Sequence, residues 1–168
     1  MADVVIEKLS KQHDRAGFDC GVPKLNLFLQ QQARSQANQG FGVTWVAVEE
    51  GQLTILGYVT VSMGHIEFDH ADPAVTARLP RYPIPVIRVG KLATDIKFQG
   101  RGIGSLLLAF AARMAISTAD KVGCYALELE AADDNVFQYY LKKGFLPLQV
   151  GSLRLYQPVE TLRRALEP

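Results

Sequence analysis

The sequence predicts a single α+β domain in which one mixed sheet holds antiparallel strands and a parallel pair. The chain has 168 residues, the length of one domain, and its 48% hydrophobic and 21% charged residues are typical of a chain that folds around a core. A short turn joins two of the early strands into a hairpin, which makes that pair antiparallel. Later a strand, a long helix and another strand follow one another, an order that places two strands side by side in parallel.

The N-terminal part is predicted to form a strand, a helix and a β-hairpin. The strand covers residues 4–9, and the helix starts at Pro23 because proline suits the first helical turn. Runs rich in β-branched and aromatic residues at 44–48 and 53–62, separated by Glu50-Gly51, predict the hairpin. The apolar residues at helical spacing after Pro23 are Leu25, Phe28, Leu29 and Ala33.

A proline-rich loop comes next, from about residue 66 to 85. Pro83 and Pro85 exclude a helix there, so we expect the loop to be extended and ordered. A strand at 86–93, a glycine-rich turn and a helix follow the loop. The apolar stripe of that helix is Ile103, Leu107, Phe110 and Met114.

The C-terminal part continues the alternation of strands and helices. Apolar and polar residues alternate over 125–131, which predicts a strand whose wetter face carries Glu128 and Glu130. Asp133 or Asp134 caps the next helix. Gly144 ends this helix, and strands at 145–150 and 152–156 and a terminal helix at 159–166 complete the chain.

Composition and charge exclude several classes of protein. The net charge of +1 gives no argument for nucleic acid binding by the chain as a whole. The longest stretch without charged residues, 51–66, is shorter than the ~20 apolar residues that span a bilayer. Asp3 and Glu7 stand where a signal peptide needs a basic flank and an apolar run. We therefore expect a cytoplasmic protein whose two cysteines, Cys20 and Cys124, are reduced core thiols.

The most informative segment is the glycine-rich turn. Without side chains in the turn, backbone N–H groups approach an anion closely, and the start of the next helix adds a partial positive charge. The candidate diphosphate site consists of Gln99, Gly100, Arg101, Gly102, Ile103, Gly104 and Ser105. A tight turn whose glycines serve only packing is the alternative. The segment is neither a Walker loop nor a GxGxxG motif.

A second motif, Tyr140-x-x-x-Gly144-Phe145, lies one strand and one helix after the turn. Tyr140 alone is also explained as a core aromatic residue with its hydroxyl at the edge. Together with Gln99-x-x-Gly102-x-Gly104, the motif resembles the GNAT superfamily of acetyl-CoA-dependent N-acetyltransferases. The resemblance implies one GNAT domain over residues 1–168, with a mostly antiparallel sheet, a central parallel pair splayed around the cofactor, and helices on both faces.

The resemblance also implies roles for individual residues. The N–H groups of the turn would hold the CoA pyrophosphate, and the strand residues Leu92, Ala93 and Thr94 would bind the pantetheine through their backbone. A strand N–H near Ala93 would meet the oxyanion. The Tyr140 hydroxyl would protonate the departing thiolate, because a phenol with an ordinary pKa near 10 carries its proton at neutral pH.

A closer resemblance, to the TacT-like tRNA-acetylating toxins, rests on four short segments. They are Phe18-Asp-Cys20-Gly21, Leu25-Asn-x-Phe28-Leu29, Leu79-Pro-Arg81-Tyr-Pro-Ile-Pro85 and Leu92-Ala-Thr-Asp95. This resemblance implies acetylation of the α-amine of aminoacyl-tRNA, which stops translation, and a ribbon-helix-helix antitoxin as partner. The chain departs from the pattern at Asp133, where the superfamily often has Asn and where we assign no cofactor contact. It departs again at Glu130, where the subfamily usually has Asp.

The general base is not evident from the sequence. Glu128, Glu130 and His65 are weak candidates, because we expect the two glutamates to be solvated and a histidine at a strand end is more often a surface residue. The other histidines, His13 and His70, have no partner at metal-site spacing, so we expect no metal.

A basic segment in the middle of the chain indicates the acceptor. We expect Arg101 to lie beside the cofactor phosphates. The basic residues that remain for a polynucleotide backbone are Arg78, Arg81, Arg88 and Lys91. A homodimer would enlarge the basic surface that these residues form. The competing interpretation is a solvated loop whose arginines pair with acids such as Glu67 and Asp69. Two other functions stay open: acetylation of a small-molecule amine or a protein N-terminus, and CoA binding without turnover.

Overall fold

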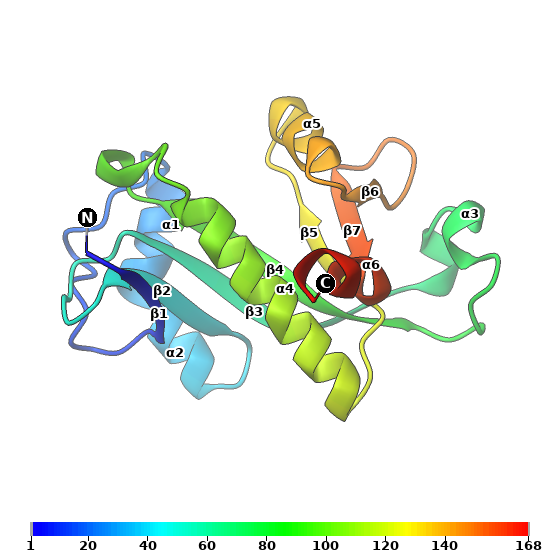
Figure 1. The fold of residues 1–168 in the computed structure, drawn as a ribbon, viewed down its shortest axis with the longest axis horizontal. Coiled ribbons are helices and arrows are strands. Elements are labelled where there is room, and N and C mark those ends of the chain that lie inside the picture. Colours follow the sequence, from blue (N-terminus) through cyan, green and yellow to red (C-terminus); the bar gives the residue numbers. More distant parts are fainter. Residues whose placement is uncertain (1, 168) are drawn as a thin grey trace. The chain divides into compact units, whose positions relative to one another are not determined.

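The computed structural model of the chain describes residues 2–167, in which seven strands form one mixed sheet in the order β1-β2-β3-β4-β5-β7-β6 (Figure 1). The strands are β1 (Val4–Lys8), β2 (Val43–Glu49), β3 (Gly57–Ile66), β4 (Ile84–Thr94), β5 (Ala126–Glu130), β6 (Leu146–Pro147) and β7 (Arg154–Pro158). The α-helices are α1 (Pro23–Leu27), α2 (Ala33–Asn38), α3 (Pro73–Thr76), α4 (Ile103–Lys121), α5 (Asp134–Lys142) and α6 (Val159–Leu166). The predicted α+β class is confirmed.

The chain divides into two compact units. The first contains the residues up to Ser62 together with Gly90–Ala111, and the second contains Met63–Val89 and the residues from Ala112 onward. Strands β3 and β4 and helix α4 each contribute residues to both units. That the two units make one domain stays a prediction.

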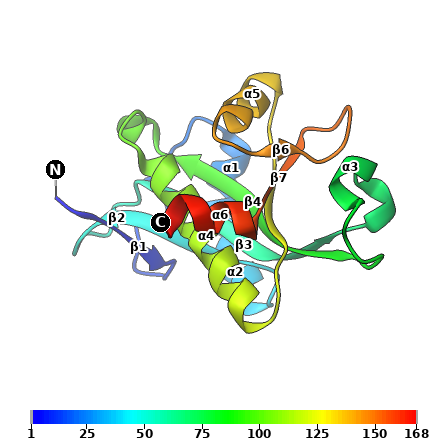
Figure 2. The ribbon, with the colours of Figure 1, turned by 45° about the vertical axis from the view of Figure 1, so that its right-hand side comes forward.

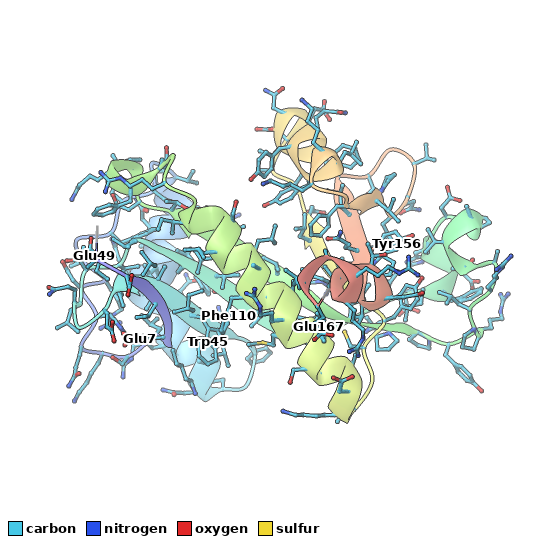
Figure 3. All side chains as sticks on the ribbon, in the orientation of Figure 1. Glu7, Trp45, Glu49, Phe110, Tyr156 and Glu167 are labelled. Atoms are coloured by element: carbon cyan, nitrogen blue, oxygen red, sulfur yellow. The ribbon has the colours of Figure 1, made fainter. Side chains whose placement is uncertain are left out.

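In the first unit, helices cover both faces of the strands. Helix α2 lies behind β2 and β3, and the first turns of α4 lie in front of them, in Figure 1 and Figure 2. On the α1 side a core cluster surrounds Tyr58, whose ring meets Phe18 edge-on and whose hydroxyl donates to the Leu25 carbonyl oxygen over 2.8 Å. On the other side the Trp45 and Phe110 rings point toward one another, with 4.9 Å between centroids (Figure 3). Apolar side chains therefore anchor the start of α4 to this unit.

In the second unit, β4 and β5 form the predicted parallel pair. Val86 lies beside Ala126 and Val89 beside Leu129, and β7 runs antiparallel to both β5 and β6. A second core cluster fills this unit; its buried members are Ile66, Ala71, Ile84, Val86, Ala126, Leu148 and Tyr156. The strand–helix–strand order thus produces the parallel pair, as predicted.

Several segments differ from the sequence-based expectation. The strand predicted at 145–150 is reduced to β6 (Leu146–Pro147), and the strand predicted at 152–156 is β7 (Arg154–Pro158). The helix after Pro23 is interrupted by a π-helical turn, η1 (Phe28–Gln32), between α1 and α2. Strand β3 starts at Gly57 rather than at residue 53. The proline-rich loop contains a 3-10 turn, η2 (Phe68–His70), and the short helix α3, which the Asp72 carboxylate caps by accepting the Ala74 N–H over 2.8 Å. Proline is unfavourable in the interior of a helix but suits its first turn, so α3 begins at Pro73 and ends before the later prolines of the loop.

Helix α4 is long and apolar. Among the described residues it is the one helix that could cross a membrane by length and composition alone. Its apolar side packs inside the protein instead, because Leu107 and Ala111 are fully buried. Core helices pass the same test of length and composition, and one face of α4, which includes Leu107 and Ala111, is buried.

Candidate active site

The turn between β4 and α4 is fixed by a buried carboxylate. Asp95 follows β4 directly and is 2% exposed. Its Oδ2 accepts the Asp19 N–H over 3.0 Å, and its Oδ1 accepts the Lys97 N–H over 2.9 Å, at the start of the 3-10 turn η3 (Ile96–Phe98). Because both oxygens are used by backbone donors, Asp95 fixes the course of the chain just before the glycine-rich turn.

Asp19 continues this network toward α1. Its carboxylate accepts the Gly21 N–H over 2.8 Å and the Asn26 side-chain N–H over 3.0 Å, and Asn26 in turn accepts the Cys20 N–H over 2.9 Å. These bonds lower the pKa of Asp19, with the Gly21 N–H as the largest cause and Asn26 next. Two segments that are far apart in the sequence, around residues 19–26 and at Asp95, therefore form one hydrogen-bonded structure.

The glycine-rich turn presents bare backbone. Gly100 and Gly102 have φ angles of +79° and +80°, which disfavour other residues, and a Cβ atom at either position would have no neighbour within 4 Å. Helix α4 begins at Ile103 and has no acidic residue in its first turn. The first N–H groups of a helix have no partner inside it. The turn thus offers open space beside free N–H donors, which is the environment that a diphosphate needs.

The remaining predicted cofactor residues adjoin this turn in the same unit. Leu92 and Thr94 are half-buried and Ala93 is buried at the end of β4, and a Cβ atom at Gly104 would lie 3.7 Å from Thr94 Oγ1. Gln99, Arg101 and Ser105 are exposed around the turn. Gln99 Nε2 donates to the Thr94 carbonyl oxygen over 3.4 Å, and the Arg101 guanidinium lies 5.5 Å from the Phe98 ring centroid. The structure therefore brings the predicted strand end and the predicted turn together.

Tyr140 lies in the second unit, in the last turn of α5. The helix starts at an N-cap, Asp133, whose carboxylate accepts the Val136 N–H over 2.9 Å. It ends in a Schellman motif: the Gly144 N–H donates to Leu141 and the Phe145 N–H donates to Tyr140, each over 3.1 Å. Gly144 has a φ of +97°, which this helix end requires. The spacing of Tyr140, Gly144 and Phe145 is thus explained by the end of the helix.

The Tyr140 ring is half-buried against two other rings. The centroid of Phe145 is 5.6 Å away and that of Tyr139 is 5.4 Å away, both edge-on. Burial, with a smaller contribution from Tyr139, raises the pKa of Tyr140 above its usual value near 10. Within residues 2–167 the hydroxyl has no hydrogen-bond partner. Tyr140 therefore carries an unused proton donor at neutral pH.

Glu128 is not solvated, and the prediction that it would be was wrong. Its side chain is 3% exposed and accepts hydrogen bonds from Arg88 Nε over 2.5 Å and from Arg154 Nη2. β5 lies between β4 and β7, which supply the two arginines. Both carboxylate oxygens are therefore occupied by guanidinium N–H donors, which makes Glu128 a poor candidate for the general base.

The other two base candidates lie at the surface. Glu130 is exposed, as predicted, and His65 Nε2 lies 2.8 Å from Glu67 Oε1 in an exposed pair. Among the residues that the structure describes, no group of three or more His, Cys, Asp or Glu side chains could hold a metal ion.

The basic segment is split between the two units. Lys91 belongs to the first unit, where its ammonium lies 4.3 Å from the Phe28 ring centroid. Arg78 and Arg81 are exposed in the second unit, and Arg81 pairs with Asp69 over 2.9 Å, as the competing interpretation expects. Arg88 lies in the second unit and is bound to Glu128. Arg154 shares that carboxylate and was not predicted; a charged residue at the start of strand β7 was its only sequence signal.

Comparison with known proteins shows which family the chain resembles. Residues 40–147 match the acetyltransferase (GNAT) domain. The chain is 30% identical to a tRNA-acetylating toxin of Mycobacterium tuberculosis over 138 residues, 82% of this chain and 81% of that protein. The structure of AtaT complexed with acetyl-methionyl-tRNAfMet is 27% identical and has a TM-score of 0.88, covering 97% of this chain and 99% of that one. A tyrosine-to-phenylalanine variant of AtaT, bound to the C-terminus of the antitoxin AtaR and acetyl-CoA, is 27% identical with a TM-score of 0.83, covering 99% of both chains.

Proposed function

The chain belongs to the GNAT acetyltransferase family, and we propose that it transfers the acetyl group of acetyl-CoA to the α-amine of an aminoacyl-tRNA. Such a reaction blocks translation, so the protein would act in the cytoplasm as the toxin of a toxin–antitoxin pair. The observation that carries the proposal is the open backbone of the turn before α4, preceded by the buried Asp95 and by the strand end at Ala93.

The residues of the first unit fit acetyl-CoA. The space beside Gly100 and Gly102 would be partly filled by any Cβ atom, and the exposed Arg101 adds a positive charge for the pyrophosphate. The backbone of Leu92, Ala93 and Thr94 would hold the pantetheine by strand-like hydrogen bonds. The bound cofactor supplies a thioester-activated acetyl group.

Tyr140 would serve as the general acid. Its hydroxyl carries its proton at neutral pH because the ordinary pKa of a tyrosine is near 10, and burial raises the pKa of Tyr140 further. The hydroxyl also has no hydrogen-bond partner in the described chain. The proton would pass from Tyr140 Oη to the sulfur of the leaving thiolate. Donation of a proton from a side-chain hydroxyl to a leaving group is general acid catalysis.

The choice of an α-amine follows from the weakness of the base candidates. An amine attacks only in its neutral form, and an α-amino group has a pKa near 7.7–8.0 against about 10.4 for a lysine side chain. In the described chain, Glu128 is paired with two arginines and His65 is exposed beside Glu67. An acceptor that is already partly neutral at pH 7 needs no stronger base, which favours an aminoacyl ester over a lysine-like amine.

The relatives support the same acceptor and partner. Similarity extends over nearly the whole chain to AtaT, which has been captured with acetyl-methionyl-tRNAfMet and, in another complex, with the C-terminus of its antitoxin and acetyl-CoA. We therefore propose an antitoxin as the protein partner of this chain, and a homodimer as a way to enlarge its RNA-binding surface.

Labelled acetyl-CoA incubated with the purified chain and charged total tRNA tests the proposal. We expect label on the aminoacyl group of one or a few tRNAs, none on uncharged tRNA, and little with Tyr140→Phe. Label only on small amines or on a protein N-terminus would replace the proposed acceptor with that substrate. Acetyl-CoA binding without transfer to any of these would show a binding module instead.

A further inference from the structure

Two arginine side chains from different strands meet at one buried carboxylate in the second unit. Glu128 on β5 accepts hydrogen bonds from Arg88 on β4 and from Arg154 on β7 while its own side chain is 3% exposed. The Arg88 and Arg154 side chains keep 37% and 30% of their surface exposed. The cluster thus has a buried negative end and two guanidiniums that reach solvent.

The cluster carries an unbalanced positive charge. Two guanidiniums and one carboxylate sum to +1, and the two like charges at one carboxylate repel each other. Each guanidinium has five N–H donors. In the described chain Arg154 uses one on Glu128, and Arg88 uses one on Glu128 and another on the His65 carbonyl oxygen over 3.1 Å. An anion that accepts the remaining outer donors would cancel the excess charge.

A structural role alone accounts poorly for this arrangement. One arginine would neutralise Glu128, and buried ionic triads can often be replaced by apolar side chains with no loss of stability. The neighbouring strand also leaves room for the guanidinium, because a Cβ atom at Gly64 on β3 would lie 3.1 Å from Arg88 Cζ. The second arginine and the space at Gly64 indicate that the cluster holds the Arg88 and Arg154 guanidiniums in a defined orientation for a further contact.

We propose that Arg88 and Arg154, which both donate to the buried Glu128 carboxylate, bind a phosphate group of the polynucleotide acceptor. The inference rests on the proposed function, since phosphate is the anion that a tRNA presents along its length. The planar guanidinium fork matches phosphate oxygens in a bidentate manner, which an ammonium cannot do. Glu128 is then a positioning residue that acts through the two arginines.

Steady-state kinetics with charged tRNA as the varied substrate test the pair. Arg154→Ala should raise KM for charged tRNA about tenfold or more, the loss expected for hydrogen bonds to a charged group, with kcat and the acetyl-CoA Kd unchanged. The log–log dependence of tRNA affinity on salt should become shallower by about 0.7–0.9. Arg154→Lys should restore the salt dependence and leave KM raised. The matched control is Arg164→Ala, which removes an exposed arginine of the same unit that pairs with Glu160 on α6.

Glu128→Gln separates positioning from simple attraction. Removing a negative charge should tighten RNA binding if the arginines act only through their charge. It should instead weaken binding if the carboxylate orients them. A thermal melt establishes that the variant is folded; if it is not, Arg154→Lys answers the same question, since it keeps the charge and loses the fork.

Each outcome has a separate meaning. If the wild-type chain does not acetylate charged tRNA, the proposed function fails and this inference fails with it. If it does, and Arg154→Ala behaves like Arg164→Ala in KM and salt dependence, the inference is wrong and the proposed function stands. If Arg154→Ala weakens binding of an acidic antitoxin peptide and leaves the tRNA KM unchanged, the pair serves a protein partner and the inference is again wrong.

Discussion

The Phe145 ring meets the Tyr140 ring edge-on, with 5.6 Å between centroids, and the Phe145 N–H donates to the Tyr140 carbonyl oxygen over 3.1 Å. The contact joins the third-last residue of the helix to the second residue beyond its cap, as in a Schellman motif. Most of this tyrosine motif is therefore a device that ends α5 and fixes the ring. Only the hydroxyl of Tyr140 has no structural use in the described chain.

Tyr140→Phe should therefore separate chemistry from folding. We expect kcat to fall by roughly 10²–10⁴-fold, the usual contribution of a positioned acid, while the acetyl-CoA Kd and the melting temperature stay unchanged because the ring contacts remain. Kinetics with the aminoacyl-tRNA acceptor, calorimetry with acetyl-CoA and a thermal melt measure the three quantities. Wild-type turnover in this variant would show that Tyr140 is a core aromatic residue and not the general acid.

The pH dependence of the rate should follow from the raised pKa of Tyr140. Burial favours the protonated phenol, so the acid form persists above the usual pKa near 10. We expect kcat to show no alkaline decline assignable to Tyr140 below about pH 10. An increase of kcat as the pH rises through about 7.7–8.0 would reflect deprotonation of the acceptor amine, whose pKa lies in that range. A decline of kcat between pH 8 and 9 that vanishes in Tyr140→Phe would contradict this assignment.

The first turn of α4 should tolerate a small side chain at Gly104 better than a charged one. Gly104 lies in the first helical turn, and an added Cβ would meet only Thr94 Oγ1 at an ordinary 3.7 Å. Gly104→Ala should fold at least as well as the wild type, because alanine is the better helix former. Gly104→Glu should weaken acetyl-CoA binding about tenfold or more, because it adds a negative charge where the pyrophosphate is proposed to bind.

Gly104→Gln is the control for this change, since it has nearly the same size and no charge. Calorimetry should rank the acetyl-CoA affinities as wild type, Gln variant, Glu variant, from tightest to weakest. Equal affinities in all three folded proteins would place the cofactor phosphates elsewhere.

Asp95→Asn should loosen the turn and the loop around Asp19. An amide has one acceptor oxygen, so either the Asp19 N–H or the Lys97 N–H would lose its partner and face an N–H₂ group. A buried N–H donor without an acceptor lowers the free energy of unfolding by about 1–3 kcal/mol. A denaturant titration should detect this decrease. We also expect weaker acetyl-CoA binding.

Asp133→Asn is a matched control, since asparagine caps helices as well as aspartate does. It should leave the free energy of unfolding nearly unchanged. An Asp95→Asn protein as stable as the Asp133→Asn protein would show that Asp95 does not hold the turn.

The sequence predicted the elements that depend on local patterns. The terminal helix was placed at 159–166, where it lies, because its apolar spacing and its neighbours are local. The π-helical turn at Phe28–Gln32 has no such signature, since one extra residue per turn changes the backbone and not the residue types. Helix α3 did carry a signal, Asp72 before Pro73, but the prolines later in the loop outweighed it.

The candidate site shows where local reasoning fails. The alternation over 125–131 placed Glu128 on the wetter face of β5, yet its partners Arg88 and Arg154 are 40 and 26 residues away in the sequence. Whether these two arginines lie beside Glu128 depends on the order of the strands in the sheet, which no local sequence pattern predicts. The glycine-rich turn could be predicted because its chemistry resides in a few consecutive residues.

Arg78 and Arg81 give the last prediction, since they are expected to contribute to tRNA binding without a structural role. The Arg81–Asp69 pair is exposed on both sides, 75% and 73%, and such pairs contribute little to stability. Arg78 is exposed and has no acidic partner within 4 Å among the described residues. Replacing both by alanine should leave the melting temperature unchanged and raise KM for charged tRNA. The salt dependence of tRNA affinity should become shallower by about 0.7–0.9 for each phosphate that the variant no longer neutralises.

Arg88 is left intact in this variant because the pair that it forms with Arg154 at Glu128 is tested separately. The control is the double variant Arg113→Ala and Arg164→Ala, which removes two other exposed arginines of the same unit and the same net charge. A general attraction between the protein and RNA would weaken equally in both variants. An unchanged salt dependence in the Arg78 and Arg81 variant, or an equal change in the control, would remove the exposed part of the basic segment from the binding surface.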